Sequence, residues 1–289
     1  MTKENRGTLF VAIAALLYSL GGLCMKFIPW SGLSINGART AIALLVIGGY
    51  LLVTRHPLRL NRWIFLGGIS VFGCNALFSV ANKLTTAANA IVLQFTAPIF
   101  VILFSRLFFK RKANKLDITA AAIVFGGVSF FFLDSLEMGG GLGNLLALLS
   151  GVSYAGIFLM NEMPDSDSIS SVFWGDVMSA LVGLPFLLGE TPLDRTAMTS
   201  LIVLGVFQVG VAYVCLCEGL KHTPPITASL ITGIEPVLNP TLVAIFYGEE
   251  VGLMALIGAA VVIVTVIAYN VLKIRLNPVP DSDDSNYIT

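Results

Sequence analysis

Long uninterrupted stretches of apolar residues, separated by short charged segments, run along the whole chain. About 20 apolar residues are needed for a helix to cross the hydrocarbon core of a bilayer, whereas strands of a membrane β-barrel alternate apolar and polar positions. The stretches here are continuous and of helical length, so the pattern predicts an all-α integral membrane protein with ten transmembrane helices. The ten are expected near Thr8–Met25, Ile35–Val53, Trp63–Ala81, Ala88–Phe109, Ile118–Leu133, Leu142–Met160, Ser171–Leu188, Met198–Gly219, Ile226–Tyr247 and Val251–Leu272.

Composition agrees with a membrane location. Of the 289 residues, 12% are charged and 56% are hydrophobic, and the mean hydropathy is +0.87, whereas a soluble domain carries roughly a quarter charged residues. Loops are short, and only the polar, acidic tail 277–289 is expected to be disordered. We therefore expect no soluble domain that could hold an active site, and no nucleic-acid partner.

Cofactor chemistry has little support in the residue pattern. All four cysteines fall inside predicted helices and are expected to act as small packing residues rather than as disulfide or zinc ligands. The glycines at 139–141 lack the lysine and serine of a phosphate-binding loop, which argues against an ATP-driven pump. We expect no metal and no cofactor.

The basic residues indicate the orientation, because cytoplasmic loops attract Lys and Arg. With ten helices both termini lie on one side, and the split is 13 on that side to 3 on the other. Both termini are therefore expected in the cytoplasm, in a multi-pass plasma membrane such as the bacterial inner membrane. Lys3 and Arg6 precede the first apolar stretch as in a secretory signal, but nine further stretches follow, so an uncleaved first helix is expected.

The chain also matches itself at a slowly drifting offset of 136 to 138 residues. This predicts two five-helix halves, 1–134 and 135–276. Because five is odd, the second half must enter the membrane from the opposite face, which makes an inverted repeat. A site on the axis between such halves can open to either side in turn, as in secondary transporters. The matching pairs are Gly7 with Gly143, Tyr18 with Tyr154, Gly73 with Gly210, Ala90 with Ala228, Pro98 with Pro236, and Phe108 with Phe246.

Several segments resemble the EamA-type permeases of the drug/metabolite transporter superfamily, in its ten-helix branch. They are "GTLFVAIAALLYSLGGLCMK", "GNLLALLSGVSYAGIFLMN", "NGARTAIALLVIG" and "ASLITGIEPVLNPTLVAIFYGEEVGLMALIG". The Glu-Pro and Gly-Glu that the family often shows are matched by Glu235-Pro236 and Gly248-Glu249, while the first half departs from them with Ala97-Pro98 and Lys110-Arg111.

The resemblance implies export of amino acids, other metabolites or drugs, with bacterial aromatic amino-acid exporters the most similar branch. It also implies a central cavity lined by the first, third and fourth helices of each half, with the fifth helices at the periphery. The superfamily contains nucleotide-sugar and sugar-phosphate exchangers as well.

Glu235 is the outstanding candidate residue. A charged side chain at the centre of a membrane helix costs at least about 2.5–3.5 kcal/mol, so it should face a cavity or a partner. Glu235 could bind a substrate ammonium group or cycle a proton, or it could bond backbone groups that Pro236 leaves free.

Proline removes an amide donor and clashes with the carbonyl four residues earlier. Pro98 and Pro236 should therefore kink their helices at repeat-equivalent points, leaving polar groups at Gln94 and Thr232, with Gly233 adding freedom. We expect Pro98, Gly233 and Pro236 to act as hinges, although prolines are also simply tolerated in membrane helices.

Polar and aromatic side chains on the other central helices predict a cavity for an amphipathic solute with a flat apolar part. Alternatively, these side chains are structural: the aromatic rings only pack between helices, and the amides only form hydrogen bonds between neighbouring helices. The expected substrate-binding residues are Tyr18, Asn75, Phe78, Gln94, Tyr154, Gln208, Tyr213 and Glu235.

Two further charges, Arg39 and Asp176, occupy repeat-equivalent positions that the inversion places toward opposite faces. They are expected not to pair, and to reach an interface or make local structural bonds rather than bind substrate. Gly143, Ala147 and Gly151 form a stripe of small residues that predicts close helix packing.

Three functions compete. The first is a secondary transporter of small amphipathic metabolites. The second, a nucleotide-sugar or sugar-phosphate exchanger, should need several basic residues in the cavity, where only Arg39 and Lys83 are candidates, both near helix ends. The third, a membrane enzyme, should need clustered His, Cys or carboxylates, whereas His56 and His222 lie in separate loops. The sequence leaves substrate, direction, ion coupling and oligomeric state open.

Overall fold

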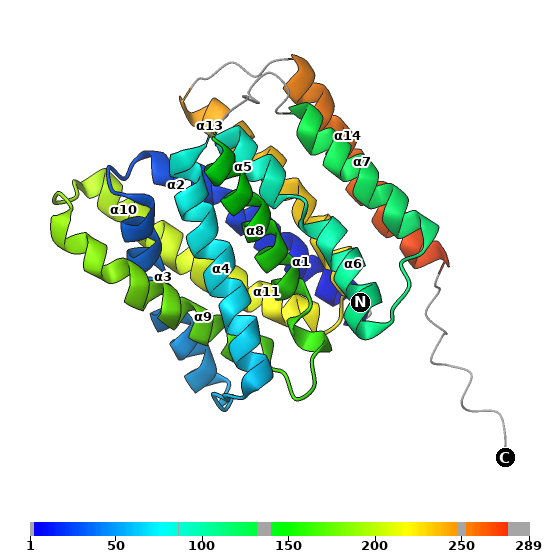
Figure 1. The fold of residues 1–289 in the computed structure, drawn as a ribbon, viewed down its shortest axis with the longest axis horizontal. Coiled ribbons are helices and arrows are strands. Elements are labelled where there is room, and N and C mark those ends of the chain that lie inside the picture. Colours follow the sequence, from blue (N-terminus) through cyan, green and yellow to red (C-terminus); the bar gives the residue numbers. More distant parts are fainter. Residues whose placement is uncertain (1–2, 86, 132–139, 248–252, 277–289) are drawn as a thin grey trace.

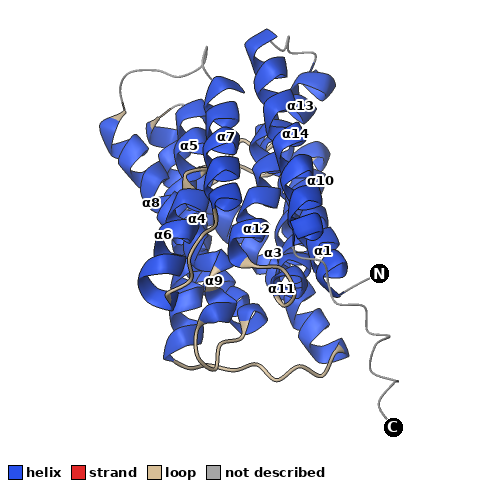
Figure 2. Ribbon diagram, turned by 90° about the vertical axis from the view of Figure 1, so that its right-hand side faces the viewer, coloured by secondary structure: helices blue, strands red, loops and turns tan. Residues whose placement is uncertain are grey.

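The computed structural model describes residues 3–85, 87–131, 140–247 and 253–276, and all the secondary structure in these ranges is helical (Figures 1 and 2). The predicted tail 277–289, the end of the fifth predicted helix and the Gly248-Glu249 pair lie outside the described residues. The first half contains α1 (Lys3–Tyr18), α2 (Leu20–Lys26), α3 (Gly32–Val53), α4 (Arg62–Leu84), α5 (Ala87–Gln94), α6 (Ala97–Phe109) and α7 (Lys115–Phe131).

The predicted second half, 135–276, follows. It contains α8 (Gly141–Phe158), η2 (Met160–Glu162), α9 (Ser168–Gly183), η3 (Leu184–Gly189), α10 (Arg195–Val203), η4 (Leu204–Val211), α11 (Ala212–Leu220), α12 (Pro225–Ile231), η5 (Thr232–Ile234), α13 (Glu235–Tyr247) and α14 (Leu253–Leu276).

Eight helical segments within the described residues are long and apolar enough to cross a membrane. The chain is thus helical throughout its described part, as an integral membrane protein should be. The two other predicted spans are helical as well: α7 is described over 17 residues, and α12 to α13 is interrupted by the short turn η5. Ten crossings and the inverted repeat stay predictions.

Side chains at the helix starts explain where the second helix of each half begins. Ser31 caps α3 by accepting from the Ser34 amide, and Asp167 caps α9 by accepting from the Ser170 amide. Capping oxygens satisfy amide groups that a helix start leaves without partners. Local sequence therefore sets both starts.

Helices of the two halves pack against each other. Helix α3 packs against α9, α1 against α11, and α4 against both α8 and α9. Small residues allow the approach: a Cβ atom at Gly37 would lie 2.5 Å from the carbonyl carbon of Gly183. The predicted packing stripe on α8 is confirmed, because a Cβ at Gly143 would lie 2.7 Å from the Leu84 backbone and one at Gly151 would lie 2.7 Å from the Gln94 carbonyl oxygen.

Helices α7 and α14 form a separate pair at the edge of the bundle (Figure 1). Gly127 lets them approach, since a Cβ there would lie 2.9 Å from Val262. At one end Lys273 forms an ion pair with Asp117 at 3.0 Å. This matches the peripheral place that the resemblance implies for the fifth helices.

Large apolar side chains cover the outside. Leu45, Leu52 and Leu188 are 77%, 81% and 94% exposed. Exposed apolar surface on this scale is unfavourable in water but not in lipid. In lipid the backbone of a spanning segment must also make its own hydrogen bonds, as it does in a helix. The surface therefore fits a bilayer.

Candidate functional site

Helices carrying predicted site residues are interrupted at those residues. Helix α5 ends at Gln94 and α6 begins at Ala97, while η5 separates α12 from α13 and Glu235 is the first residue of α13. These breaks precede Pro98 and Pro236, at the points where the prolines are expected to interrupt the helices, and the hinge role stays a prediction. The first helix breaks after Tyr18. Backbone groups at such breaks are available to other partners.

The eighth predicted helix, Met198–Gly219, is not regular. Between α10 and α11 the segment η4 is a π-helix, and Gln208 lies in it. Such π-helical turns are rare and are frequent at functional sites. No feature of the sequence pointed to this one.

Glu235 contacts the second half's first helix. The Tyr154 hydroxyl donates to Glu235 Oε2 at 3.4 Å, and the Tyr154 ring packs on Phe158 with ring centroids 4.9 Å apart. Tyr154 is buried. The structure thus brings together two predicted site residues, one on α8 and one on α13.

Tyr213 joins residues of the first half. Asn75 Nδ2 donates to the Tyr213 hydroxyl at 3.3 Å, and the Tyr18 and Tyr213 rings meet edge to face with centroids 5.7 Å apart. The Tyr18 hydroxyl is buried and has no hydrogen-bond partner among the described residues. A buried hydroxyl normally has a partner, so this oxygen is available to a bound solute.

Gln94 and Phe78 lie on the first-half side. Gln94 Nε2 donates to Cys74 Sγ at 3.6 Å, one residue before Asn75 on α4. Phe78 packs instead against a separate apolar cluster formed by Ala81, Ala90 and Ala147. The predicted role of Phe78 in substrate binding stays a prediction.

Of the two alternatives expected for Arg39, the structure shows local structural bonding rather than a side chain that reaches an interface, because the side chain is only 4% exposed. Its Nε and Nη2 donate to Asn36 Oδ1 at 3.3 and 3.0 Å, and Nη1 donates to Gln208 Oε1 at 3.2 Å. Within the described residues no ion pair joins it to Asp176, in line with the expectation that these two do not pair. The guanidinium nevertheless lies in electrostatic range of Asp176 and Glu235.

Close packing surrounds one of the predicted hinge residues. A Cβ atom at Gly233 would lie 2.9 Å from Val124 on α7 and 3.3 Å from the Phe95 ring. Pro98 and Pro236 are buried as well. Close packing therefore accounts for the presence of a glycine at position 233. Its role as a hinge stays a prediction.

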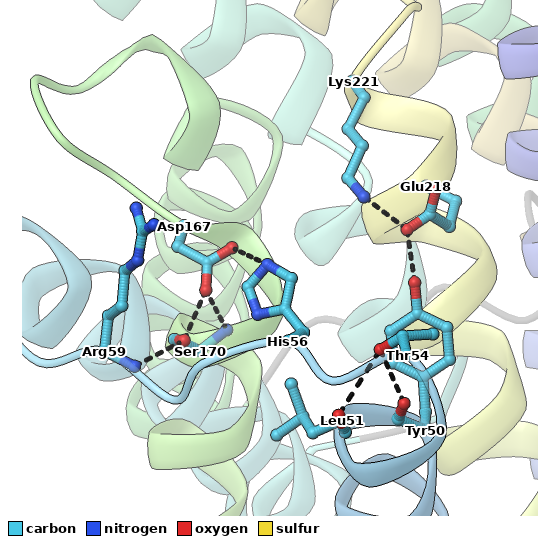
Figure 3. A network of polar contacts seen from close by, with 9 residues as sticks. All are labelled: Tyr50, Leu51, Thr54, His56, Arg59, Asp167, Ser170, Glu218 and Lys221. Carbon is cyan, nitrogen blue, oxygen red and sulfur yellow. Dashed lines mark hydrogen bonds and ion pairs between the residues drawn. The ribbon is translucent and has the colours of Figure 1, made fainter.

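Polar contacts tie the halves together at the end where α3 and α11 finish (Figure 3). The Tyr50 hydroxyl donates to Glu218 Oε1 at 2.5 Å, and Lys221 binds the same oxygen at 2.5 Å. His56 Nε2 lies 3.5 Å from Asp167 Oδ1, at the start of α9. The end of α3 and the loop that follows it are thereby attached to α11 and to the start of α9.

A smaller set of contacts closes the opposite end. The Ser31 amide donates to Glu190 Oε1 at 2.8 Å, and Trp30 Nε1 donates to the Thr191 carbonyl at 2.7 Å. At each end, therefore, the start of one second helix is joined to the loop after the other.

Sequence reasoning missed several of these residues. Asn36 and the Tyr50–Glu218 pair were not singled out, although a carboxylate in an apolar helix is a usable signal for Glu218. All four cysteines are buried, as packing residues should be. Among the described residues no group of three or more His, Cys, Asp or Glu could hold a metal ion.

Known proteins resemble this chain over most of its length. The EamA-like transporter family matches twice, at residues 5–133 and 141–271. An uncharacterized transporter of Clostridium kluyveri is 23% identical, covering 90% of this chain and 91% of its own length. The uncharacterized transporter YyaM of Bacillus subtilis is 25% identical, covering 82% and 83%, and one of Archaeoglobus fulgidus is 23% identical, covering 90% and 95%.

A solved crystal structure shares the fold, with a TM-score of 0.79 at 19% identity, covering 93% of this chain and 98% of that one. The two family matches together span most of the 289 residues. The protein is therefore a multi-pass membrane protein that belongs to the EamA-like transporter family.

Proposed function

We propose that this protein is a secondary transporter that exports small amphipathic metabolites, above all amino acids and aromatic ones in particular, by alternating access. The observation that carries the proposal is a set of aromatic and polar contacts inside the bundle, in which Tyr18 and Asn75 contact Tyr213, and Tyr154 contacts Glu235; the three tyrosines are buried and Asn75 and Glu235 are partly buried. These residues come from α1, α4, α8, α11 and α13, which belong to both halves. A carboxylate among phenol rings suits a cationic, partly apolar solute.

The arrangement of helices supports an inverted repeat. If the halves are exchanged, α1 corresponds to α8 and α4 to the segment from α10 to α11. The packing of α1 on α11 then corresponds to that of α8 on α4, and α3 on η4 corresponds to α9 on α4. The two family matches support the same duplication.

Alternating access also needs an end that can open. The contacts of Tyr50 with Glu218 and of His56 with Asp167 close one end, while those of Ser31 with Glu190 close the other. In the proposed mechanism one set breaks while the other holds, and the broken helices at Pro98 and Pro236 bend between the two states.

The protein's surroundings follow from the charge bias. Both termini are proposed to be cytoplasmic, in a bacterial inner membrane, because most Lys and Arg fall on the side of the termini. The partners are the lipid bilayer and a small-molecule substrate. Hydrolysis or group transfer is not part of the proposal.

Counterflow in liposomes tests the substrate class. Purified protein is reconstituted with one unlabelled solute inside and a labelled one outside, using aromatic and aliphatic amino acids, nucleotide-sugars and cationic drugs. We expect accumulation of labelled aromatic amino acids above protein-free liposomes. Accumulation of nucleotide-sugars alone would instead favour the exchanger alternative, which a single buried Arg39 supports only weakly, because a diphosphate would need several cations.

A further inference from the structure

Arg39 is a buried cation with only neutral partners. Its hydrogen bonds go to the amide oxygens of Asn36 and Gln208, and no carboxylate lies within ion-pair distance in the described part of the chain. A buried charge that makes no direct ion pair is costly. Because both hydrogen-bond partners of Arg39 are neutral amides, its guanidinium can accept a carboxylate from a bound solute.

The guanidinium belongs to the same centre as Glu235. It lies in electrostatic range of Glu235 and of Tyr213. Gln208, which holds it, also approaches the first helix just after the break at Tyr18, since a Cβ at Gly21 would lie 3.4 Å from Gln208 Nε2. By the same criterion the centre contains one cation, Arg39 on α3, and two carboxylates, Glu235 on α13 and Asp176 on α9.

We infer that Arg39, oriented by Asn36 and Gln208, binds the carboxylate of a zwitterionic substrate whose ammonium group is bound by Glu235. The inference rests on the proposed transport function and narrows its substrate to α-amino acids. A guanidinium donates two parallel hydrogen bonds to a carboxylate, which fixes orientation as well as charge. The unpartnered Tyr18 hydroxyl supplies a further group close to the same solute.

Asp176 offers a competing explanation for Arg39. Its side chain is fully buried, and neither carboxylate oxygen has a hydrogen-bond partner among the described residues. Arg39 lies in electrostatic range of it. If Arg39 serves only to balance Asp176, then removing both charges together should restore everything that removing Arg39 alone destroys.

The experiment measures a selectivity ratio. Counterflow of phenylalanine, which carries both charges, is compared with that of phenethylamine, which lacks the carboxylate, in the same liposomes. Because both solutes meet the same protein, the ratio does not depend on how much of a variant is folded. The variants are Arg39→Gln, Arg39→Lys, Arg39→Gln with Asp176→Asn, and Arg106→Gln as an exposed control on α6.

We expect the wild type and Arg106→Gln to prefer phenylalanine. Arg39→Gln should lower that preference by about 10- to 100-fold, the loss of a charge-assisted hydrogen bond, and Arg39→Lys should retain part of it. The double variant, which does not leave the Asp176 carboxylate without its neighbouring cation, should keep the low ratio. It therefore decides the question even if Arg39→Gln alone does not fold.

Three results would overturn the inference: equal counterflow of both solutes by the wild type, an unchanged ratio in Arg39→Gln, or a ratio restored by Asp176→Asn. The first would leave a transporter of amines, so the proposed function would survive. Counterflow of none of the solutes tested above would instead overturn the proposed function itself.

Discussion

The crossing of α3 and α9 gives a quantitative test of how the halves are joined. A Cβ atom at Gly37 would lie 2.5 Å from the carbonyl carbon of Gly183 and 2.6 Å from the amide nitrogen of Leu184. Ordinary contact begins near 3.4 Å, so Gly37→Ala must push the two backbones apart by about 0.9 Å. Both neighbours are backbone atoms and cannot rotate away.

Overpacking of this kind costs about 1–3 kcal/mol, or about 5- to 150-fold in the unfolding equilibrium. Gly49→Ala is the matched control, because Gly49 lies on the same helix and a Cβ there would meet nothing within 4 Å. Both variants gain the same helix propensity, about 1 kcal/mol relative to glycine. The difference between them therefore isolates the clash at the crossing.

The assay is unfolding of the purified protein by titration with a denaturing detergent, followed by tryptophan fluorescence. Gly37→Ala should unfold at a lower detergent fraction than the wild type, and Gly49→Ala at the same or a higher one. If the two variants were equally stable, the close approach of α3 and α9 would be refuted.

Four further outcomes are expected. Glu235→Gln should lower amino-acid counterflow at least about tenfold, because an amide loses the charge-assisted bond to an ammonium group; intact counterflow with a lost response to a pH gradient would assign Glu235 to the proton instead. Pro236→Ala should slow exchange more than it weakens equilibrium binding, and equal losses in the two assays would contradict a hinge. Asn75→Ala should reduce counterflow while the amount of protein in the membrane stays constant, and wild-type kinetics would leave Asn75 as a bond between helices. A reporter fused after Lys112 should read cytoplasmic, since an external reading would contradict the inverted repeat.

The sequence by itself determined that the chain is a helical membrane protein, because each helix that spans the bilayer needs some 20 consecutive apolar residues and such stretches are recognisable in the sequence. It also located the breaks near Gln94 and Thr232, since proline lacks an amide donor wherever it stands. The stripe of Gly143, Ala147 and Gly151 was readable for a similar reason: small residues at helical spacing permit close packing whatever the partner helix is.

Only the tertiary structure decided which side chains meet. Arg39 was expected to reach an interface or to make local structural bonds, and its bonds to Asn36 are local. Its position along one helix, however, says nothing about Gln208, 169 residues away, which accepts its other hydrogen bond. The π-helical turn that carries Gln208 depends on packing against α3 and has no local signal. Phe78 and Asn75 lie three residues apart on one helix, yet Phe78 packs against Ala81, Ala90 and Ala147 while Asn75 bonds to Tyr213. Periodicity fixes the direction of a side chain on its own helix, whereas its partners depend on how separate helices are placed, and that is set by contacts between residues far apart in the chain.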